Sequence, residues 1–456
     1  MSRPNIVFYF SDQQRWDTLG CYGQKLPVTP NLDRLAEEGV RFENAFTCQP
    51  VCGPARACLQ TGRYATQIGC SINGVAPPFG QVKMLAQYFN ENGYATAYVG
   101  KWHLATDRPA GINYETSAIP AERRGGYKDY WMASDVLEFT SHGYNGYVYN
   151  GDNERVPFTG YRADCINDFA IDFVHSRKDS NEPFFLFVSQ IEPHHQNDRR
   201  RYEGPDGSKE RFADYEAPGD LKAYSEAHES GEDISNWKQN YPDYLGCCHS
   251  LDYNVGRLVD TLKEQGMWEN TILFYTADHG SHFITRGIEA EYKRTCHDAS
   301  IHVPLIAVGP GFRGGKVVRH VVSLLDLPVT LLDCAGIERP DGFQGRSLLP
   351  LAAEPEMDWE DVAFMQISES RVGRAIRTPE YTYSVRAEGD GYQTFGSSVY
   401  YEEFFYVLKD DPYQQNNLAA DPAWAQTRAQ LGQVLKRKMR EAGEEEPEIR
   451  PARAWT

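Results

Sequence analysis

The stretch Thr271-Ile-Leu-Phe-Tyr-Thr-Ala-Asp278-His279-Gly280 is a short apolar run that ends in a carboxylate and an imidazole. A run of this length, rich in β-branched and aromatic residues, predicts a buried strand. Three other runs share this pattern: residues 5–10 precede Ser11-Asp12-Gln13, residues 95–99 precede Gly100-Lys101-Trp-His103, and residues 183–189 precede Glu192-Pro-His194-His195. Each predicted strand therefore delivers polar side chains at its carboxyl end.

Helical segments separate these predicted strands, namely residues 30–38, 82–92 and 245–265. Alternating strands and helices favour an α/β fold, a doubly wound and mainly parallel sheet with helices on both faces. In open sheets of this kind, ligands bind beyond the carboxyl ends of the strands. A single polar residue after a strand is more often a turn or cap residue. Four such clusters in one chain predict a shared site.

The pattern changes beyond Pro310. Residues 321–334 read as a helix, residues 374–386 alternate like strands, residues 400–408 form another apolar run, and residues 422–442 read as a helix with a solvated face. We therefore expect a catalytic domain over residues 1–350 and a smaller C-terminal α+β subdomain over residues 351–456. The segment 125–160, rich in tyrosine, glycine and aspartate, reads as long loops that cover the sheet.

Composition excludes several classes of partner. The net charge of -18 over 456 residues disfavours general binding to nucleic acid or to an anionic membrane, which needs a basic surface. No stretch is long enough to span a bilayer, and the N-terminal apolar run lacks the features of a signal peptide. The ten cysteines contain no C-x-x-C pair. We expect reduced thiols and a cytoplasmic protein; no pattern indicates an oligomeric state.

The most informative motif is Cys52-Gly-Pro54-Ala-Arg56, followed by Thr61-Gly62-Arg63. Proline suits a first helical turn and glycine a helix end, so a helix is expected between them. Cys52 would then lie at a helix N-terminus, where backbone N–H groups favour negative charge. A cysteine in that position could be a nucleophile of low pKa. A buried and inert cysteine is the alternative.

The order Cys-x-Pro-x-Arg resembles the sulfatase signature, in which this cysteine is oxidised to formylglycine. Other segments resemble the family in family order, among them Thr29-Pro-Asn-Leu-Asp33, Gly100-Lys-Trp-His103, Thr276-Ala-Asp-His-Gly280, Tyr292-Lys-Arg-Thr295, Leu325-Asp-Leu-Pro328 and Gln344-Gly-Arg-Ser347. The resemblance extends over nearly the whole chain. It implies the doubly wound sheet of the alkaline-phosphatase-like superfamily.

The resemblance also implies a metal site made by Asp12, Gln13, Asp278, His279 and the modified Cys52. Oxygen ligands suit a hard cation, Ca²⁺ foremost, with Mg²⁺ or Mn²⁺ as alternatives. His279 and Gln13 stand where many sulfatases have asparagine and aspartate. This variant resembles some bacterial members of the family, including phosphonate monoester hydrolases.

The implied reaction is covalent, because hydrated formylglycine offers one hydroxyl for attack on sulfur and a second that expels sulfate and regenerates the aldehyde. Family resemblance distributes the remaining roles. Arg56 would hold the hydrate, His103 would deprotonate its second hydroxyl, Lys101 and Lys293 would bind the sulfate oxygens, and His194, with His195 as second candidate, would bind sulfate or protonate the leaving oxygen.

We therefore expect a sulfatase that cleaves a sulfate ester, on a sugar or glycan fragment, after a formylglycine-generating or maturase enzyme has modified Cys52. One alternative is a phosphonate monoester or phosphodiester hydrolase on the same scaffold. A second is a non-catalytic protein that binds sulfated glycans. Segments 113–153 and 199–232 are the expected sources of specificity. His282, His297, Asp298 and His302 could contact substrate or serve only as turn residues.

Overall fold

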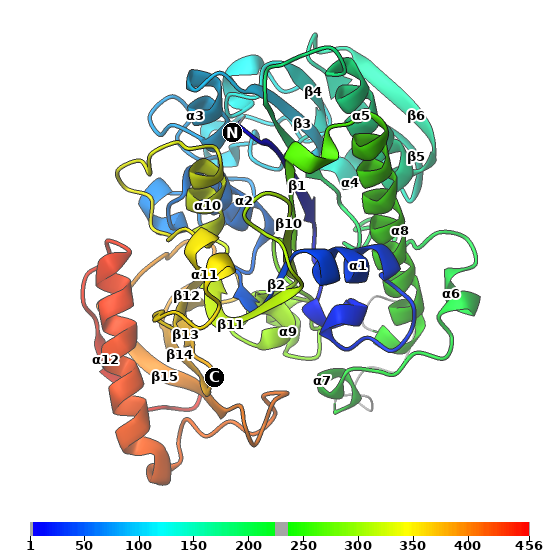
Figure 1. Cartoon of the computed structure of the whole chain (residues 1–456). Coiled ribbons are helices and arrows are strands. Elements are labelled where there is room, and N and C mark those ends of the chain that lie inside the picture. Colours follow the sequence, from blue (N-terminus) through cyan, green and yellow to red (C-terminus); the bar gives the residue numbers. More distant parts are fainter. Residues whose placement is uncertain (1–2, 224–235, 456) are drawn as a thin grey trace.

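The computed structural model describes residues 3–223 and 236–455 (Figure 1). Its centre is a sheet in the strand order β11-β2-β10-β8-β1-β7-β3-β4-β5-β6, with β9 paired to β2. The strands are β1 (Asn5–Ser11), β2 (Val40–Phe46), β3 (Ala95–Lys101), β4 (Tyr130–Ser134), β5 (Tyr144–Asn150), β6 (Arg155–Tyr161), β7 (Phe184–Ser189), β8 (Thr271–Ala277), β9 (His302–Val303), β10 (Leu305–Val308) and β11 (Lys316–Ser323). The mainly parallel α/β sheet predicted from the sequence is confirmed.

The four predicted strands lie side by side at the middle of this sheet. β1 pairs in parallel with β8 on one side and with β7 on the other, and β7 pairs in parallel with β3. The register sets Ser11 opposite Ala277, and Phe10 opposite Ser189. The residues that follow these strands therefore leave the sheet at one edge.

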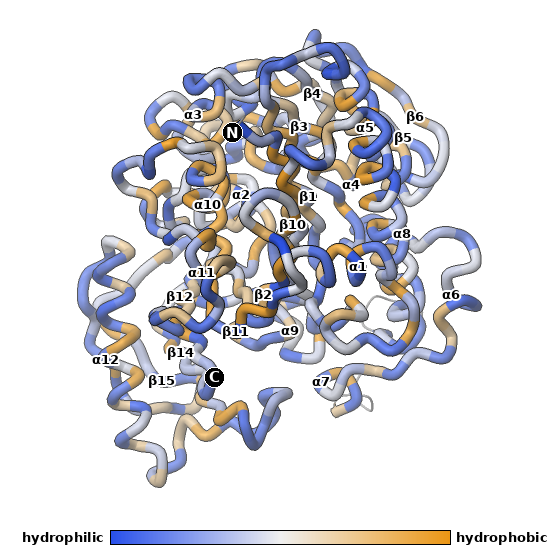
Figure 2. Tube along the Cα trace, in the orientation of Figure 1, coloured by the Kyte–Doolittle hydropathy of each residue, from blue (hydrophilic) through white to orange (hydrophobic). Residues whose placement is uncertain are grey.

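Helices cover both faces of the sheet. α3 (Leu85–Glu91) and α10 (Asp326–Cys334) pack on the face formed by alternate β1 residues such as Phe8. α1 (Pro30–Glu38), α5 (Arg162–Ser176) and α8 (Trp237–Glu264) pack on the other face, which contains Tyr9. Apolar residues concentrate on the central strands, whereas the peripheral loops are hydrophilic (Figure 2). A strand whose side chains are buried on both faces of the sheet must be apolar throughout, and the central strands of this sequence are.

A second sheet lies in the C-terminal part of the chain. It has the order β12-β13-β14-β15-β16, from β12 (Ala363–Ile367), β13 (Val372–Arg377), β14 (Tyr381–Ala387), β15 (Val399–Val407) and β16 (Glu448–Arg450). α12 (Ala425–Glu441) packs on this sheet through Leu431, Leu435 and Met439. The remaining α-helices of the described residues are α2 (Cys52–Thr61), α4 (Leu137–Thr140), α6 (Ser208–Arg211), α7 (Gly219–Lys222), α9 (Asp298–Ile301) and α11 (Leu349–Ala353).

Two predictions about secondary structure were wrong. Segment 125–160 contains β4, α4, β5 and β6, which extend the sheet, instead of long loops alone. β5 and β6 pair antiparallel near the edge of the sheet and expose many side chains, so they lack the apolar run of a central strand. Residues 321–323 end strand β11, and the helix begins only at Asp326. Pairing with β2 overrides the helical spacing of Val321, Val322 and Leu325.

Within the described ranges, no helix combines the length and the apolar character needed to cross a bilayer. All ten cysteines are free.

Candidate active site

Cys52 is the first residue of α2 and lies at the edge of the central sheet where β1 and β8 end. The helix begins here, two residues before Pro54, and ends at Gly62, whose φ of 66° is the left-handed conformation that glycine tolerates. All ten residues of α2 are buried. The Asn73 side chain accepts a hydrogen bond from the Gly53 N–H at 2.9 Å and so satisfies one of the free amides of the first turn. The fold thus fixes Cys52 at a buried helix start.

Four side chains converge at this point. One ligand atom from each of Asp12, Cys52, Asp278 and His279 lies within 4.8 Å of the other three, and all four side chains are buried. Asp12 follows β1, and Asp278 and His279 follow β8, the strand paired with it. The Cys52 Sγ atom lies 3.2 Å from His279 Nε2 and 3.6 Å from Asp12 Oδ1. Such a cluster has the size of a cation site.

Gln13 completes the set of oxygen atoms. Its φ of 67° turns the chain sharply after β1, and its amide donates to the Tyr202 hydroxyl at 2.8 Å and to Ser281 Oγ at 3.2 Å. These bonds leave Gln13 Oε1 as a buried oxygen without a hydrogen-bond partner in the part of the chain described, and Asp278 Oδ2 has only a long ion pair of 3.4 Å with Arg56. Unpaired buried acceptors are costly unless a donor or cation completes them. The residues present therefore fit a hard divalent cation.

Three cations surround the cluster. Lys293 Nζ lies 2.6 Å from Cys52 Sγ and 3.2 Å from His279 Nε2. Arg56 contacts Asp12 at 3.0 Å and Asp278 at 3.4 Å. Lys101 Nζ lies 2.9 Å from the same Asp12 oxygen, so the cluster joins charges of both signs. This arrangement can bind an anion and stabilise charge that develops on it.

Burial controls the protonation of the site. Burial, together with the neighbouring Asp12 carboxylate, raises the pKa of Asp278 to about 7. Burial and Asp12 also raise the pKa of the Cys52 thiol to about 12. The thiol is therefore neutral near pH 7, which argues against the low-pKa thiolate that the helix N-terminus alone suggested. For Lys101, Asp12 and Glu138 raise the pKa although burial alone would lower it.

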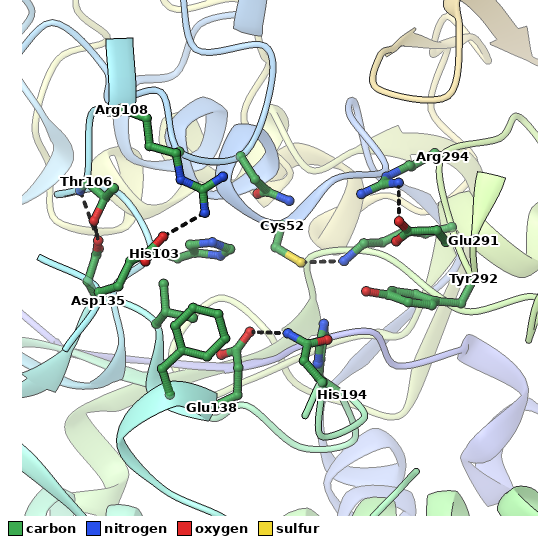
Figure 3. A pocket seen from close by; sticks show the side chains of 17 residues that line it. Cys52, His103, Thr106, Arg108, Asp135, Glu138, His194, Glu291, Tyr292 and Arg294 are labelled. Carbon is green, nitrogen blue, oxygen red and sulfur yellow. Dashed lines mark hydrogen bonds and ion pairs between the residues drawn. The ribbon is translucent and has the colours of Figure 1, made fainter. Parts of the chain in front are cut away.

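His103 and His194 lie in the wall of a cavity next to Cys52 (Figure 3). His103 has a φ of 59°, and its Nδ1 atom has no hydrogen-bond partner among the described residues. Burial and the nearby Lys101 hold the pKa of His103 well below its usual range. His195 stacks on His194 at 4.5 Å and packs against Tyr292 at 4.2 Å. His195 therefore supports this wall from behind, and of the two only His194 is among the described residues that line the cavity.

Several cavity residues are absent from the set predicted by sequence. They are Asn73, Gly74, Thr106, Arg108, Glu115, Asp135, Val136, Glu138, Phe139, Asn197, Glu291, Tyr292 and Arg294. Segment 113–153, which the sequence marked as a source of specificity, supplies Glu115, Asp135, Val136, Glu138 and Phe139. Segment 199–232 supplies no lining residue from its described part, and its residues 224–232 lie outside the described ranges.

The four residues left open by the sequence make structural contacts. His282 interacts with the Lys293 backbone carbonyl at 3.0 Å, and His297 with the Tyr406 hydroxyl at 3.0 Å. Asp298 forms an ion pair with Arg377 at 3.0 Å. His302 stacks on Trp16 at 4.3 Å. These contacts hold the loop after β8 against the rest of the fold, and none of the four residues is among those that line the cavity.

Known proteins resemble the chain over almost its full length. The sulfatase family model matches residues 4–337, and the model of the N-sulphoglucosamine sulphohydrolase C-terminal region matches residues 290–441. An ulvan-active sulfatase of Formosa agariphila is 32% identical, over 97% of this chain and 82% of the relative. An N-acetylglucosamine-6-O-sulfatase of Bacteroides thetaiotaomicron is 27% identical, over 98% and 88%.

A crystal structure of a Bacteroides fragilis protein assigned to the sulfatases superposes with a TM-score of 0.80 at 27% identity, covering 97% of this chain and 96% of the other. Fold, residue cluster and family model agree. The chain belongs to the sulfatase family of the alkaline phosphatase superfamily and is a sulfuric ester hydrolase.

Proposed function

We propose that the chain removes sulfate from a sulfated saccharide, with a formylglycine made from Cys52 and a divalent cation held by Asp12, Gln13, Asp278 and His279. The observation that carries this proposal is the convergence of Cys52 with Lys293 at 2.6 Å and with the other three residues of the ligand cluster, Asp12, Asp278 and His279. The Cys52 Sγ atom takes the place that the single oxygen of the formylglycine aldehyde would have. Formylglycine would supply a hydrated aldehyde with two hydroxyls, one to attack sulfur and one to release sulfate.

The residues of the chain have distinct roles in this proposal. Lys293 and Lys101 bind the sulfate oxygens and counter the charge that grows on them during the transfer. Arg56 fixes Asp12 and Asp278 and keeps them oriented toward Cys52. His103 would accept the proton of the second formylglycine hydroxyl, because its Nδ1 atom has no hydrogen-bond partner among the described residues. His194 also lines the cavity and is the residue proposed to bind the sulfate or to protonate the leaving oxygen.

Ca²⁺ is the proposed cation, since Asp12, Asp278 and Gln13 offer oxygen atoms that suit a hard ion. The cation would polarise a bound oxygen and lower its pKa. His279 makes the ligand set less anionic than four oxygen donors, so Mg²⁺ and Mn²⁺ are the matched comparisons. A formylglycine-generating or maturase enzyme is the implied partner, because Cys52 lies in its signature motif.

A saccharide substrate is supported by two relatives, one active on ulvan and one on N-acetylglucosamine-6-sulfate by name. The cavity wall agrees with this assignment, because it is rich in carboxylate and amide groups. Such groups accept and donate hydrogen bonds to sugar hydroxyls.

The test compares kcat/KM on sulfated monosaccharides with kcat/KM on matched phosphonate monoesters and phosphodiesters, because specificity is the ratio of these values. We expect sulfate esters to be preferred. A preference for phosphorus would establish the alternative hydrolase. Intact-protein mass spectrometry tests the modification separately: conversion of Cys52 exchanges sulfur and two hydrogens for one oxygen. An unmodified thiol in active enzyme would refute the formylglycine assignment, and Cys52→Ala serves as the inactive control.

A further inference from the structure

The charge of the cavity wall limits what the substrate can carry besides its sulfate. We propose that the substrate is a singly sulfated and otherwise uncharged sugar ring, and that a second anionic group on the same ring is rejected. The proposal rests on the proposed function and names the substrate class of that same site.

Acidic side chains outnumber basic ones in the lining. Four lining side chains are carboxylates (Glu115, Asp135, Glu138 and Glu291), whereas three are lysine or arginine (Arg108, Lys293 and Arg294). Lys293 belongs to the sulfate-binding end beside Cys52. Lys101, which lies 3.3 Å from Glu138 and also pairs with Asp12, offsets part of this charge. The wall beyond the sulfate-binding end remains acidic because Asp135 forms no ion pair with the described residues and accepts hydrogen bonds from Thr106 and backbone N–H groups instead. A charged group of the same sign brought into a partly buried site is repelled more strongly than in water.

The two arginines of the lining are already paired. Arg108 and Arg294 lie on opposite sides of the cavity, with Cys52 between them (Figure 3). Arg108 contacts Glu115 at 2.7 Å. Arg294 contacts Glu291 at 2.8 Å and Glu369 at 2.5 Å. A second sulfate or a carboxylate on the sugar would have to compete with these internal carboxylates. The competition is stronger at Arg294, which is 8% exposed and holds two carboxylates, than at Arg108, whose side chain is 64% exposed.

The acidic wall suits hydroxyl groups instead. Glu138 is 4% exposed, and its Oε2 atom accepts no hydrogen bond from the described residues, although it lies 3.3 Å from Lys101 Nζ. An ionised carboxylate accepts hydrogen bonds only, so its natural partner in a ligand is a hydroxyl or amide N–H. Asn197 lies 3.5 Å from the other Glu138 oxygen. Phe139, 47% exposed, follows Glu138 in α4 and offers an apolar surface to one face of a sugar ring.

The size of the cavity also favours one ring. Its volume is about 250 Å³, below the roughly 300–1,000 Å³ of sites that enclose drug-sized ligands. A single sulfated ring can enter, and any further sugars of a chain must remain outside. The enzyme would therefore act on free sugars or on chain ends.

The experiment measures kcat/KM for the mature enzyme on positional isomers of N-acetylglucosamine and galactose monosulfate. Each is compared with its disulfated counterpart, and 4-nitrophenyl sulfate reports basal sulfatase activity. We expect the best monosulfate to exceed its disulfated counterpart by about tenfold or more, the effect of one repulsive charge pair in a partly buried site. The ratio should narrow as salt is raised, because salt screens the repulsion.

A matched pair of variants isolates the wall charge. Glu115→Gln frees Arg108, so the ratio of disulfated to monosulfated kcat/KM should rise several-fold. Glu91→Gln removes a carboxylate from an exposed ion pair with Lys83, outside the cavity, and should leave the ratio unchanged. Hydrolysis of 4-nitrophenyl sulfate together with an equal or higher kcat/KM on disulfated sugars would overturn this inference alone. No hydrolysis of any sulfate ester would overturn the proposed function and this inference with it.

Discussion

Glu369 and Arg294 form an ion pair of 2.5 Å that joins the C-terminal sheet to the active site. Glu369 lies on the turn between β12 and β13, and Arg294 directly follows Lys293. The same carboxylate accepts a hydrogen bond at 2.7 Å from the backbone N–H of Asn73, the residue that contacts Gly53 at the start of α2. Arg294 and Glu369 both have positive φ values, 66° and 62°. One buried carboxylate thus links both sides of the catalytic cluster.

Glu369→Gln should therefore lower catalysis through Lys293. The amide cannot balance the Arg294 charge, so the loop that carries Lys293 should lose its fixed position, and kcat/KM should fall by about tenfold or more, mainly in kcat. The matched control is Glu444→Gln, which breaks another Arg–Glu pair of the second sheet, with Arg374 at 2.8 Å. This control should lower the melting temperature and keep kcat/KM. Equal losses of kcat/KM in both variants would show that Glu369 contributes only to stability.

Lys293→Ala should remove one of the charges that stabilise the transferring sulfate. Loss of a single pre-positioned donor of this kind costs about 10²–10³ in kcat. Lys316→Ala provides the comparison, because this lysine donates hydrogen bonds to the Ala352 and Ala353 backbone carbonyls and does not line the cavity. Steady-state kinetics on an aryl sulfate measure the change in kcat for both variants. A kcat within about twofold of wild type would remove Lys293 from the catalytic set.

A divalent cation should stabilise the folded protein. Ligands that bind the native state alone add about 2.7 kcal/mol at a concentration of 100 Kd, so Ca²⁺ should raise the melting temperature of enzyme treated with a chelator. Asp278→Ala should abolish this shift. Asp252→Ala should retain it, because the Asp252 carboxylate lies in α8 and accepts a hydrogen bond from the Leu32 N–H at the start of α1. Calorimetry with Ca²⁺, Mg²⁺ and Mn²⁺ ranks the three ions by their affinity for the protein. An identical shift in both variants would place the cation elsewhere.

The ion pair between Asp298 and Arg377 should make stability depend on acid pH. Burial alone would raise the pKa of Asp298, but the Arg377 guanidinium holds it below the ordinary value of 3.8. The stabilisation is therefore complete above the ordinary pKa and is lost as pH falls through the lowered pKa of the folded state.

Asp298→Asn should cost about 3–5 kcal/mol at pH 7, because it leaves a buried guanidinium without its partner, and this cost should shrink below about pH 4. Denaturant unfolding across this pH range measures the effect. The exposed pair between Arg177 and Glu182 supplies the control, since Glu182→Gln should change stability by about 1 kcal/mol or less. A pH-independent loss in Asp298→Asn would contradict the assignment.

The sequence by itself determined the central strands and the order of the catalytic residues. Apolar runs before Asp12, Lys101, His194 and Asp278 predicted buried parallel strands, because a strand covered on both faces must be continuously apolar. Family motifs then predicted Cys52 and its neighbours as site residues, because the resemblance implies covalent sulfate chemistry on a modified Cys52.

Only the tertiary structure decided what surrounds them. β11 gains its strand conformation from pairing with the distant strand β2, and β5 and β6 gain theirs from pairing with each other and with β4, which local periodicity does not record. The cavity wall unites Asn73, Arg108, Glu138, Tyr292 and Arg294 from four separate segments of the chain, and their sequence spacing follows no repeat. The net charge around the substrate depends on side chains from several such segments, so it could be determined only from the folded structure.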